Sequence, residues 1–278
     1  MTERARISDY VLPLVREPSS AQVRGVFGHG LDVVRDDGRM LYLGGFDRPL
    51  SCVGAQLPAA DLGRVLSQAN AGDAVLLGES RVRVLRAGAE VASVSLMGAE
   101  AVPLRVTAPL TRDAREDLVA RIEACGLSES CGLPWDAGLR CALAGLDAGD
   151  AGELAEAVRW LYGRGLGLTP SGDDILTGFG CGLAAAGRPR RRQELVGAVR
   201  AVSETRRTTY VSDAYLDAMA AGRVNESYFD LVRDARVGVV TSAHIRAVRE
   251  VGHTSGDDML LGFGLALGVR YPGVGDAR

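Results

Sequence analysis

The feature that most constrains the fold is a motif that occurs twice in the second half of the chain. Residues 171–180 read Ser-Gly-Asp-Asp-Ile-Leu-Thr-Gly-Phe-Gly, and residues 255–264, which lie 84 positions later, repeat eight of these ten residues. Each copy begins like a helix and continues into an apolar run. One copy is explained by a helix start alone, whereas two copies indicate two helix starts with related roles, arranged about a pseudo-two-fold axis.

A glycine-rich stretch, residues 163–170, leads into the first copy. Its alternating glycines, among them Gly165 and Gly167, allow backbone conformations that are closed to other residues. Ser171, followed three residues later by Asp174, resembles a capping box. A helix that begins in this way points free backbone N–H groups and the positive end of its dipole outward, so the stretch predicts an anion-binding site.

Glycines also recur inside the two apolar runs, where each costs about 1 kcal/mol of helix stability relative to alanine. Gly178 and Gly182 are four residues apart in the first run, as are Gly264 and Gly268 in the second. This spacing produces smooth faces on which two helix backbones can approach closely. We therefore expect the two helices to pack together and to bring both Ser-Gly-Asp-Asp starts around one cleft.

The paired aspartates of the motif are the main candidate functional groups. One carboxylate in a first helical turn stabilises the helix by about 0.3–1 kcal/mol through the dipole, but a second carboxylate repels the first. Three interpretations are open: helix capping, binding of a substrate ammonium or amide N–H group, and a bridging Mg²⁺ ion. We predict Asp173, Asp257 and His253 as catalytic groups that bind or move a proton. A capping imidazole explains His253 equally well.

A polar cluster between the two copies, residues 204–209, combines arginine forks with hydroxyl groups. Such groups suit a carboxylate or a phosphate, although the end of one helix and the cap of the next explain the same residues. The predicted anion- and substrate-binding residues are Gly165, Gly167, Thr169, Ser171, Gly172, Asp174, Arg206, Arg207, Thr208, Thr209, Ser255 and Asp258. No metal ligands and no cofactor are predicted, with Mg²⁺ kept as the open alternative above.

The hydrophobic period changes near residue 110. Residues 23–107 contain short β-branched runs separated by glycine-bearing turns, and residues 31–43 resemble a hairpin with an Asp-Gly turn. From residue 112 onward the apolar residues recur at helical spacing. We predict an α+β chain in which residues 1–110 form a small closed or strongly curved β-rich domain and residues 111–278 form a helical domain.

Composition excludes several classes of function. All 32 basic residues are arginines, so a Schiff-base lysine, covalently held pyridoxal phosphate and a Walker-type lysine are excluded. A net charge of −3 predicts no nucleic-acid partner. No apolar run reaches the roughly 18 residues of a membrane span, and residues 1–9 lack a signal-peptide core, so we expect a cytoplasmic protein without a membrane partner. The five scattered cysteines predict neither disulfides nor a zinc site.

Three segments together resemble the AllH family: residues 163–174, the Thr-Thr-x-x-Ser-x-x-x-Leu segment at 208–216, and Gly-His-Thr-Ser-Gly-Asp-Asp at 252–258. The resemblance covers the helical half well and the β-rich half more loosely. It implies a subunit of oxamate carbamoyltransferase that acts with FdrA-like and AllG-like partner proteins in purine-nitrogen catabolism. In that reaction oxalurate and phosphate interconvert with oxamate and carbamoyl phosphate.

Three classes of function are therefore open. The first is the carbamoyltransferase subunit, in which the glycine-rich loop holds phosphate, Arg206 or Arg207 holds the substrate carboxylate, and Asp173, Asp257 or His253 handles the amide proton. The second is an enzyme of specialised metabolism in which an amine displaces a sulfate or phosphate group of the same molecule. The third is a non-catalytic scaffold, in which the glycines only pack helices and the aspartates only cap them.

Overall fold

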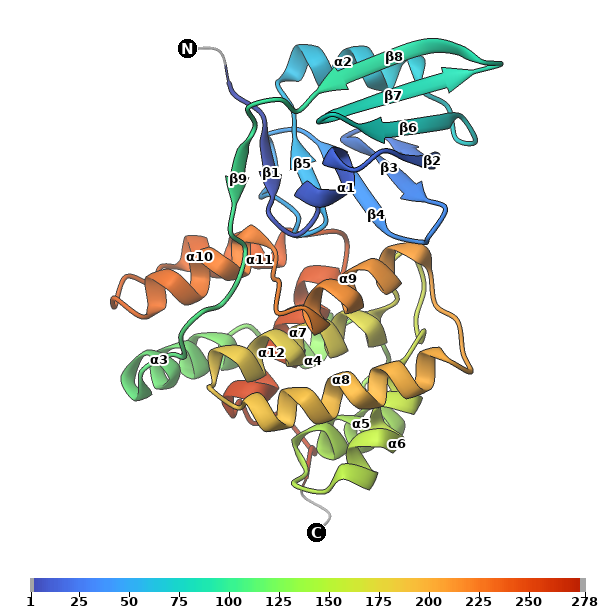
Figure 1. The fold of residues 1–278 in the computed structure, drawn as a ribbon. Helices are drawn as coiled ribbons and strands as arrows, with labels where there is room; N and C mark the ends of the chain where they lie inside the picture. Colours follow the sequence, from blue (N-terminus) through green and yellow to red (C-terminus); the bar gives the residue numbers. More distant parts are fainter. Residues whose placement is uncertain (1–2, 276–278) are drawn as a thin grey trace. The chain divides into compact units, whose positions relative to one another are not determined.

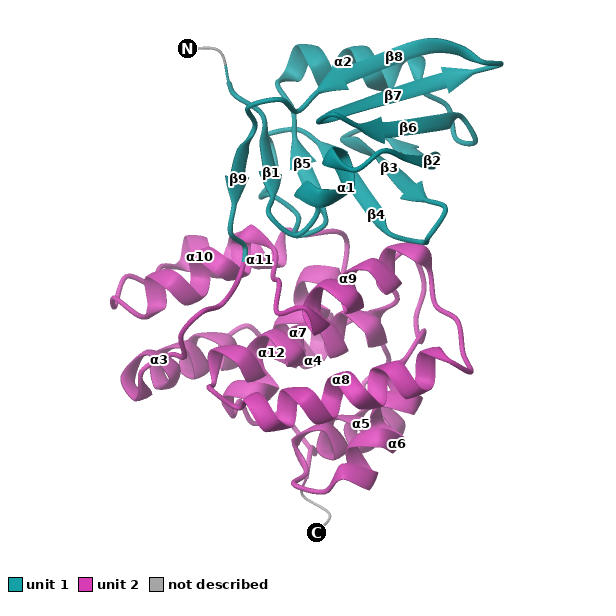
Figure 2. Cartoon of the chain, in the orientation of Figure 1, with its two compact units in different colours: residues 1–104 teal, residues 105–278 magenta. Residues whose placement is uncertain are grey.

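A computed structural model describes residues 3–275 of the chain. The chain divides into two compact units, residues 1–104 and residues 105–278, which are coloured separately in Figure 2. The first unit is built mainly of strands and the second of helices (Figure 1). The predicted α+β class, with a β-rich amino-terminal part and a helical carboxy-terminal part, is confirmed.

The first unit contains a curled sheet of nine strands within the described residues. The strands are β1 (Arg6–Ser8), β2 (Ser19–Phe27), β3 (Gly30–Arg35), β4 (Met40–Gly44), β5 (Gly54–Gln56), β6 (Ala74–Gly78), β7 (Arg81–Arg86), β8 (Ala89–Ser95) and β9 (Glu100–Val102). Their order in the sheet is β8-β7-β6-β2-β3-β4-β5-β1-β9. Neighbours are antiparallel except for β1 with β9 and β4 with β5. Two helices, α1 (Leu12–Arg16) and α2 (Ala59–Gln68), complete the unit.

The predicted hairpin is confirmed at β3 and β4. Val34 pairs with Met40, and between them Gly38 adopts a φ of 86°, which a residue with a side chain rarely tolerates. The β-branched runs read over residues 23–107 end instead with β9 at Val102. Pro103 explains this early end, because proline has no N–H group to continue the ladder.

The second unit contains ten helices within the described residues. They are α3 (Arg112–Glu123), α4 (Leu127–Ser130), α5 (Ala137–Asp147), α6 (Ala151–Leu161), α7 (Ser171–Ala185), α8 (Pro189–Ser203), α9 (Tyr210–Ala220), α10 (Glu226–Ala235), α11 (Ser242–Arg249) and α12 (Ser255–Leu267). The side chain of Asp150 caps α6 and that of Thr209 caps α9.

The centre of this unit is the pair α7 and α12. Nearly every residue of both helices is buried, which is typical of helices enclosed on all sides. The two backbones touch at glycines: a Cβ atom on Gly178 would lie 1.9 Å from the Met259 carbonyl oxygen, and one on Gly262 would lie 2.0 Å from that of Ile175. Gly178 and Gly262 occupy the same position in the two motif copies, and so do the residues that they contact, Met259 and Ile175. The contact is therefore reciprocal.

The close helix pairing is as expected, but the expected glycines are right only for α7. Gly182 also faces α12, where its Cβ would lie 2.6 Å from the Phe263 carbonyl oxygen. On α12, however, Gly264 faces the Tyr271 hydroxyl rather than α7, and Gly268 lies at the helix end with a φ of 105°. The four-residue spacing in the second run therefore does not mark the helix contact.

Candidate functional site

The two copies of the motif form the starts of α7 and α12, and these starts lie side by side. Oγ1 of Thr169, two residues before α7, is 2.8 Å from Oγ of Ser255, the first residue of α12. The reciprocal crossing of the two helices produces this arrangement, because it places both amino termini at the same end of the pair. Segments 84 residues apart in the sequence therefore contribute to one location.

Each copy directs its second aspartate toward the serine of the other copy. The carboxyl of Asp174 interacts with the Ser255 hydroxyl, and that of Asp258 lies beside the Ser171 hydroxyl. These two aspartate–serine contacts are related by the same approximate two-fold axis as the contacts of Gly178 and Gly262 further along the helices. Ser171 is thus directed toward α12, and α7 begins after Pro170 without a side-chain cap. The predicted capping box at Ser171 is wrong.

Asp174 and Asp258 are buried, with 5% and 0% of their surface exposed. One oxygen of Asp258 accepts the Gly132 amide proton at 2.8 Å, while Oδ2 of each aspartate is buried without a partner in hydrogen-bond geometry. Buried polar atoms are usually satisfied, so two orphaned oxygens at one location need an explanation. Rotation of the neighbouring serine and threonine hydroxyls or a bound group with N–H or O–H donors would supply it.

Burial controls the charge of this pair. Desolvation raises the pKa of Asp174 well above its usual value, and the charge of Asp258 raises it further. Desolvation also raises the pKa of Asp258, although the Gly132 amide and the neighbouring hydroxyls of Ser171 and Thr254 oppose the rise. Two adjacent carboxyls in such surroundings favour states in which one carries a proton. A buried carboxyl that keeps its proton can donate a hydrogen bond, whereas an ionised carboxyl only accepts.

Asp173, a predicted catalytic group, is also buried but its oxygens have partners. Oδ1 accepts the Gly163 amide proton at 2.8 Å, and Oδ2 accepts the Thr208 hydroxyl. Burial raises the pKa of Asp173, against these hydrogen bonds and the nearby Ser212 hydroxyl. These contacts fasten the glycine-rich loop and the segment before α9 to the start of α7. The catalytic role of Asp173 stays a prediction.

Asp257, its equivalent in the second copy, pairs with an arginine. Its two oxygens accept hydrogen bonds from Nε and Nη2 of Arg249, at 2.6 and 3.0 Å. Burial alone would raise the pKa of Asp257, but the hydrogen bonds from Arg249, together with the nearby Ser130 hydroxyl, outweigh it and hold the pKa below its usual value. The aspartate thus connects α12 to the end of α11, and its catalytic role also stays a prediction.

The other predicted residues lie at the edges of this location or beyond it. His253 and Arg207 are exposed, and Arg206 donates to the Arg159 carbonyl at the end of α6. The Thr209 hydroxyl donates to the Leu168 carbonyl and accepts the Ser212 amide proton at the start of α9. The structure therefore does not bring these residues together with the buried carboxyl pair.

The predicted glycines support close packing. A Cβ atom on Gly172 would lie 2.0 Å from the Leu161 carbonyl oxygen, and one on Gly165 would lie 2.6 Å from the Ser171 nitrogen. The Gly172 amide donates to the Arg164 carbonyl at 2.8 Å, so it is not free to bind an anion. Gly167 is exposed with a φ of 90° and open space around it. Of these three glycines, only Gly167 has open space at its Cβ position.

Four contributors were missed from the sequence. They are Gly132, Thr254, Arg249 and Ser130. Gly132 is needed for steric reasons, because a Cβ atom there would lie 2.3 Å from the Ser171 hydroxyl oxygen. It sits more than 100 residues from the second motif, and no local pattern marks it. Thr254 directly precedes the second motif copy, and this position is the one sequence signal that could have identified any of the four residues.

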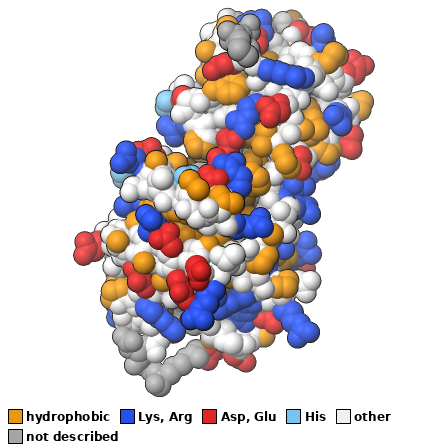
Figure 3. Space-filling view, turned by 90° about the vertical axis from the view of Figure 1, so that its left-hand side faces the viewer, with side chains coloured by type: hydrophobic (Ala, Val, Ile, Leu, Met, Phe, Trp, Pro, Cys, Tyr) orange, Lys and Arg blue, Asp and Glu red, His pale blue; other side chains and the backbone are white. Residues whose placement is uncertain are grey.

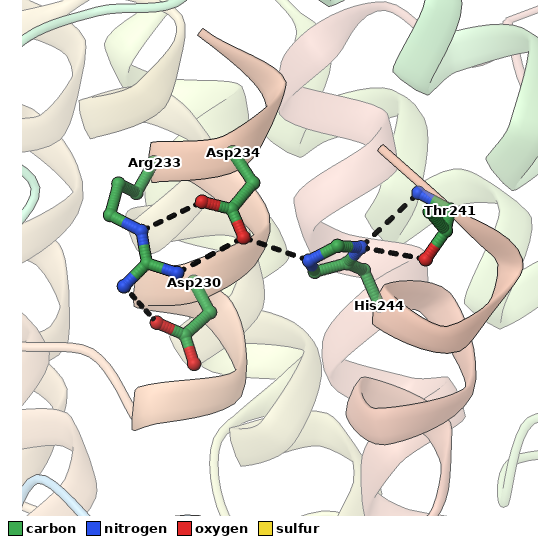
Figure 4. Close-up of polar contacts among 5 residues, drawn as sticks. All are labelled: Asp230, Arg233, Asp234, Thr241 and His244. Atoms are coloured by element: carbon green, nitrogen blue, oxygen red, sulfur yellow. Dashed lines mark hydrogen bonds and ion pairs between the residues drawn. The ribbon is translucent and has the colours of Figure 1, made fainter. Parts of the chain in front are cut away.

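A second polar cluster lies between α10 and α11 (Figure 4). His244 contacts Oδ2 of Asp234 through Nε2 at 2.9 Å and the Thr241 hydroxyl through Nδ1 at 3.0 Å. The Thr241 amide also donates to Nδ1, and the Thr241 side chain accepts from the His244 backbone. These are the contacts of a capping box at the start of α11. Arg233 holds the pKa of Asp234 below its usual value.

The described residues contain no group of three or more His, Cys, Asp and Glu side chains suited to a metal ion. No helix within residues 3–275 is both long enough and apolar enough to cross a membrane. On the face drawn in Figure 3, arginine and acidic side chains are interspersed. That face therefore presents charge of mixed sign.

Comparison with known proteins finds a family match for part of the chain. Residues 161–267 match the family described as oxamate carbamoyltransferase subunit AllH. The AllH match begins at the last residue of α6 and ends at the last residue of α12. It therefore contains both motif copies and the crossing of α7 and α12, and it confirms the resemblance found in the sequence. No solved structure matches the chain significantly.

Proposed function

We propose that this chain is the subunit of an oxamate carbamoyltransferase that binds the carbamoyl and amide groups during transfer. The AllH match supports the reaction, since the family is described as a subunit of that enzyme. The observation that carries the assignment of the site is the buried pair Asp174 and Asp258, each with an orphaned oxygen. An amide or carbamoyl group has N–H donors and a carbonyl acceptor, and so complements a pair that accepts and donates.

The proposed step is attack of the oxamate amide nitrogen on the carbonyl carbon of carbamoyl phosphate. A C–N bond forms, the C–O bond to phosphate breaks, and phosphate leaves with the bonding electron pair. Asp258 in its ionised form accepts the N–H proton of the attacking nitrogen. Asp174 in its protonated form donates a hydrogen bond to the carbamoyl oxygen as negative charge develops there. The reverse sequence produces carbamoyl phosphate from oxalurate and phosphate.

The charged ends of the substrates need a different source of binding. Among the residues that the structure describes, no arginine contacts Asp174 or Asp258. The two helix amino termini favour negative charge through their dipoles, but a phosphate and a carboxylate require more compensation. We propose that a partner subunit provides cationic groups opposite this pair, consistent with the description of the family as a subunit. An isolated chain then binds substrate but does not turn it over.

The test is carbamoyl transfer by the complex reconstituted with its partner subunits. Asp174→Asn and Asp258→Asn should each lower kcat by at least about 100-fold, the contribution typical of one proton-handling group. Asp113→Asn, which alters an exposed first-turn aspartate of α3, is the matched control and should leave kcat unchanged. Wild-type kcat in both motif variants would show that the pair has no part in the reaction.

A further inference from the structure

The buried carboxyl pair is covered by other parts of the chain. Asp174 and Asp258 are only 5% and 0% exposed, so part of this cover must move before any ligand reaches them. Two segments lie against the pair. One contains Gly132, and the other is the glycine-rich loop, residues 163–169. The two segments differ in how firmly they are held.

The segment that contains Gly132 is fixed to the core. Gly132 donates its amide proton to Oδ1 of Asp258 at 2.8 Å. The next residue, Leu133, is buried in the hydrophobic core. The Trp135 ring packs edge-on against Tyr271, with 6.1 Å between the ring centroids. Movement of this segment would therefore break apolar contacts as well as a buried hydrogen bond.

The glycine-rich loop is also fixed, but only at its first end. The Gly163 amide donates to Oδ1 of Asp173 at 2.8 Å, and the Arg164 carbonyl accepts the Gly172 amide proton at 2.8 Å. Asp173 and Gly172 both belong to the first turn of α7. This end of the loop therefore stays with the helix.

The middle of the loop has few contacts. Leu166 is 92% exposed, and within the described part of the chain no backbone hydrogen bond holds residues 165–167. Gly165 and Gly167 have φ angles of 121° and 90°, and glycine can leave this region as readily as it enters it. Segments with few contacts open at low cost, and hinges lie where φ and ψ can change.

The second end of the loop covers the site through hydroxyl groups. Oγ1 of Thr169 is 2.8 Å from Oγ of Ser255 and lies near the Asp174 carboxyl. The Thr209 hydroxyl donates to the Leu168 carbonyl. A single hydrogen bond of this kind contributes little net stability, so it can break and re-form. Movement of residues 165–169 would uncover Asp174 and Ser255 while the first end of the loop stays in place.

We propose that residues 165–169 form a lid over the carboxyl pair, with Gly165 and Gly167 as its hinge and the Thr169–Ser255 hydrogen bond as its latch. The structure is the closed state, and opening admits the ligand. The lid rests on the proposed function only in that the pair has a ligand. Opening also occurs in the free chain, so it can be measured without a substrate.

The first test places a thiol under the lid. Ser171 is 4% exposed and lies against Gly165. Ser171→Cys, combined with Cys141→Ser to remove an exposed thiol, should react slowly with methyl methanethiosulfonate, and peptide mass mapping locates the label. Adding Thr169→Ala removes the latch and should speed this labelling about two- to tenfold, the factor that one hydrogen bond commonly contributes.

Gly167→Ala should speed the labelling as well, because alanine is strained at a φ of 90° and weakens the closed state. Gly238→Ala is the matched control: this glycine also has a positive φ, 75°, and open space at its Cβ position, but lies in the turn after α10. It should leave the rate unchanged. If Ser171→Cys does not fold, Ser255→Cys serves as the marker with Gly167→Ala. Equal labelling rates in all these variants, or immediate labelling of the parent, would overturn the lid.

The second test closes the latch covalently. Thr169→Cys together with Ser255→Cys should form a disulfide on mild oxidation, and the oxidised chain should lose its thermal stabilisation by carbamoyl phosphate or oxalurate. Reduction should restore it, and the reduced form is the control because it carries the same substitutions. Stabilisation that survives oxidation would overturn the lid. Lid-dependent labelling without stabilisation of the wild type would support the lid and contradict the proposed function alone.

Discussion

Asp174 and Asp258 occupy equivalent positions in two copies of one motif, and burial disfavours the charged form of both carboxyls. Each is buried beside the other copy, and no arginine contacts either of them among the described residues. Asp257, by contrast, is paired with Arg249, so its charge is compensated. The motif thus contains one aspartate with an arginine or backbone partner and one buried carboxyl without a counterion. Buried carboxyls with strongly raised pKa values are concentrated at functional sites.

The charge of Asp174 predicts a pH dependence of stability. Its pKa is raised in the folded state above the ordinary 3.8, mainly by burial. The folded chain therefore holds the proton more tightly than the unfolded chain. This contribution to stability is fully present below the unfolded pKa and is lost as pH rises through the folded pKa.

Asp174→Asn removes this dependence, so its Tm relative to wild type should increase as pH rises from about 4 toward 8. Thermal unfolding at matched pH values measures the difference, with Asp113→Asn as the exposed control. A difference in Tm that is constant across this range would mean that Asp174 titrates normally in the folded protein.

At the residue scale the sequence identified the location better than the roles. The duplicated Ser-Gly-Asp-Asp pattern predicted that Asp174, Ser255 and Asp258 share a site, and the structure places them together. It assigned proton handling to Asp173 and binding to Asp174. Adjacent helical residues point in directions about 100° apart, and only the packing decides which of them faces the other helix. Gly132 could not be found because its contact with the motif is entirely tertiary.

The crossing of α7 and α12 is the element on which the site depends. The amino termini meet only because the backbones touch at Gly178 and Gly262, where side chains would collide with carbonyl oxygens. Glycine inside a helix is unfavourable, and here the cost is offset by the close contact of two buried helices. The apolar character of both helices, read from the sequence, was sufficient to predict their burial. Which glycine of α12 contacts α7 depends on how α12 is rotated about its own axis. The sequence pattern therefore did not predict Gly262 as the contact.

Gly178→Ala should destabilise the protein by about 1–3 kcal/mol or more, the range for overpacked cores. Because the contact is reciprocal, Gly262→Ala should cost a similar amount. Gly197→Ala is the control: this glycine lies on the exposed side of α8 with no atom near its Cβ position, and alanine there should add about 0.5–1 kcal/mol. Urea unfolding compares the three. Neutral effects at both Gly178 and Gly262 would contradict the backbone contact.

At the scale of the whole molecule, the two units have different relations to the known family. The AllH match lies entirely within the helical unit and covers both motif copies, while residues 1–104 lie outside it. The change of hydrophobic period near residue 110 predicted the two kinds of structure correctly. The three-residue strands β1 and β5 were not predicted, since their pairing is fixed by neighbours distant in the sequence rather than by a local pattern.

The central claim is that both motif copies form one binding site for the carbamoyl and amide groups, and ligand-induced thermal stabilisation of the isolated chain tests it most directly. A ligand at 100 times its Kd adds about 2.7 kcal/mol, and about 2–4 °C in Tm per kcal/mol is expected. Carbamoyl phosphate or oxalurate should stabilise wild type and Asp113→Asn by several degrees, but neither Asp174→Asn nor Asp258→Asn. Equal stabilisation of all four proteins, or none of the wild type, would contradict the claim.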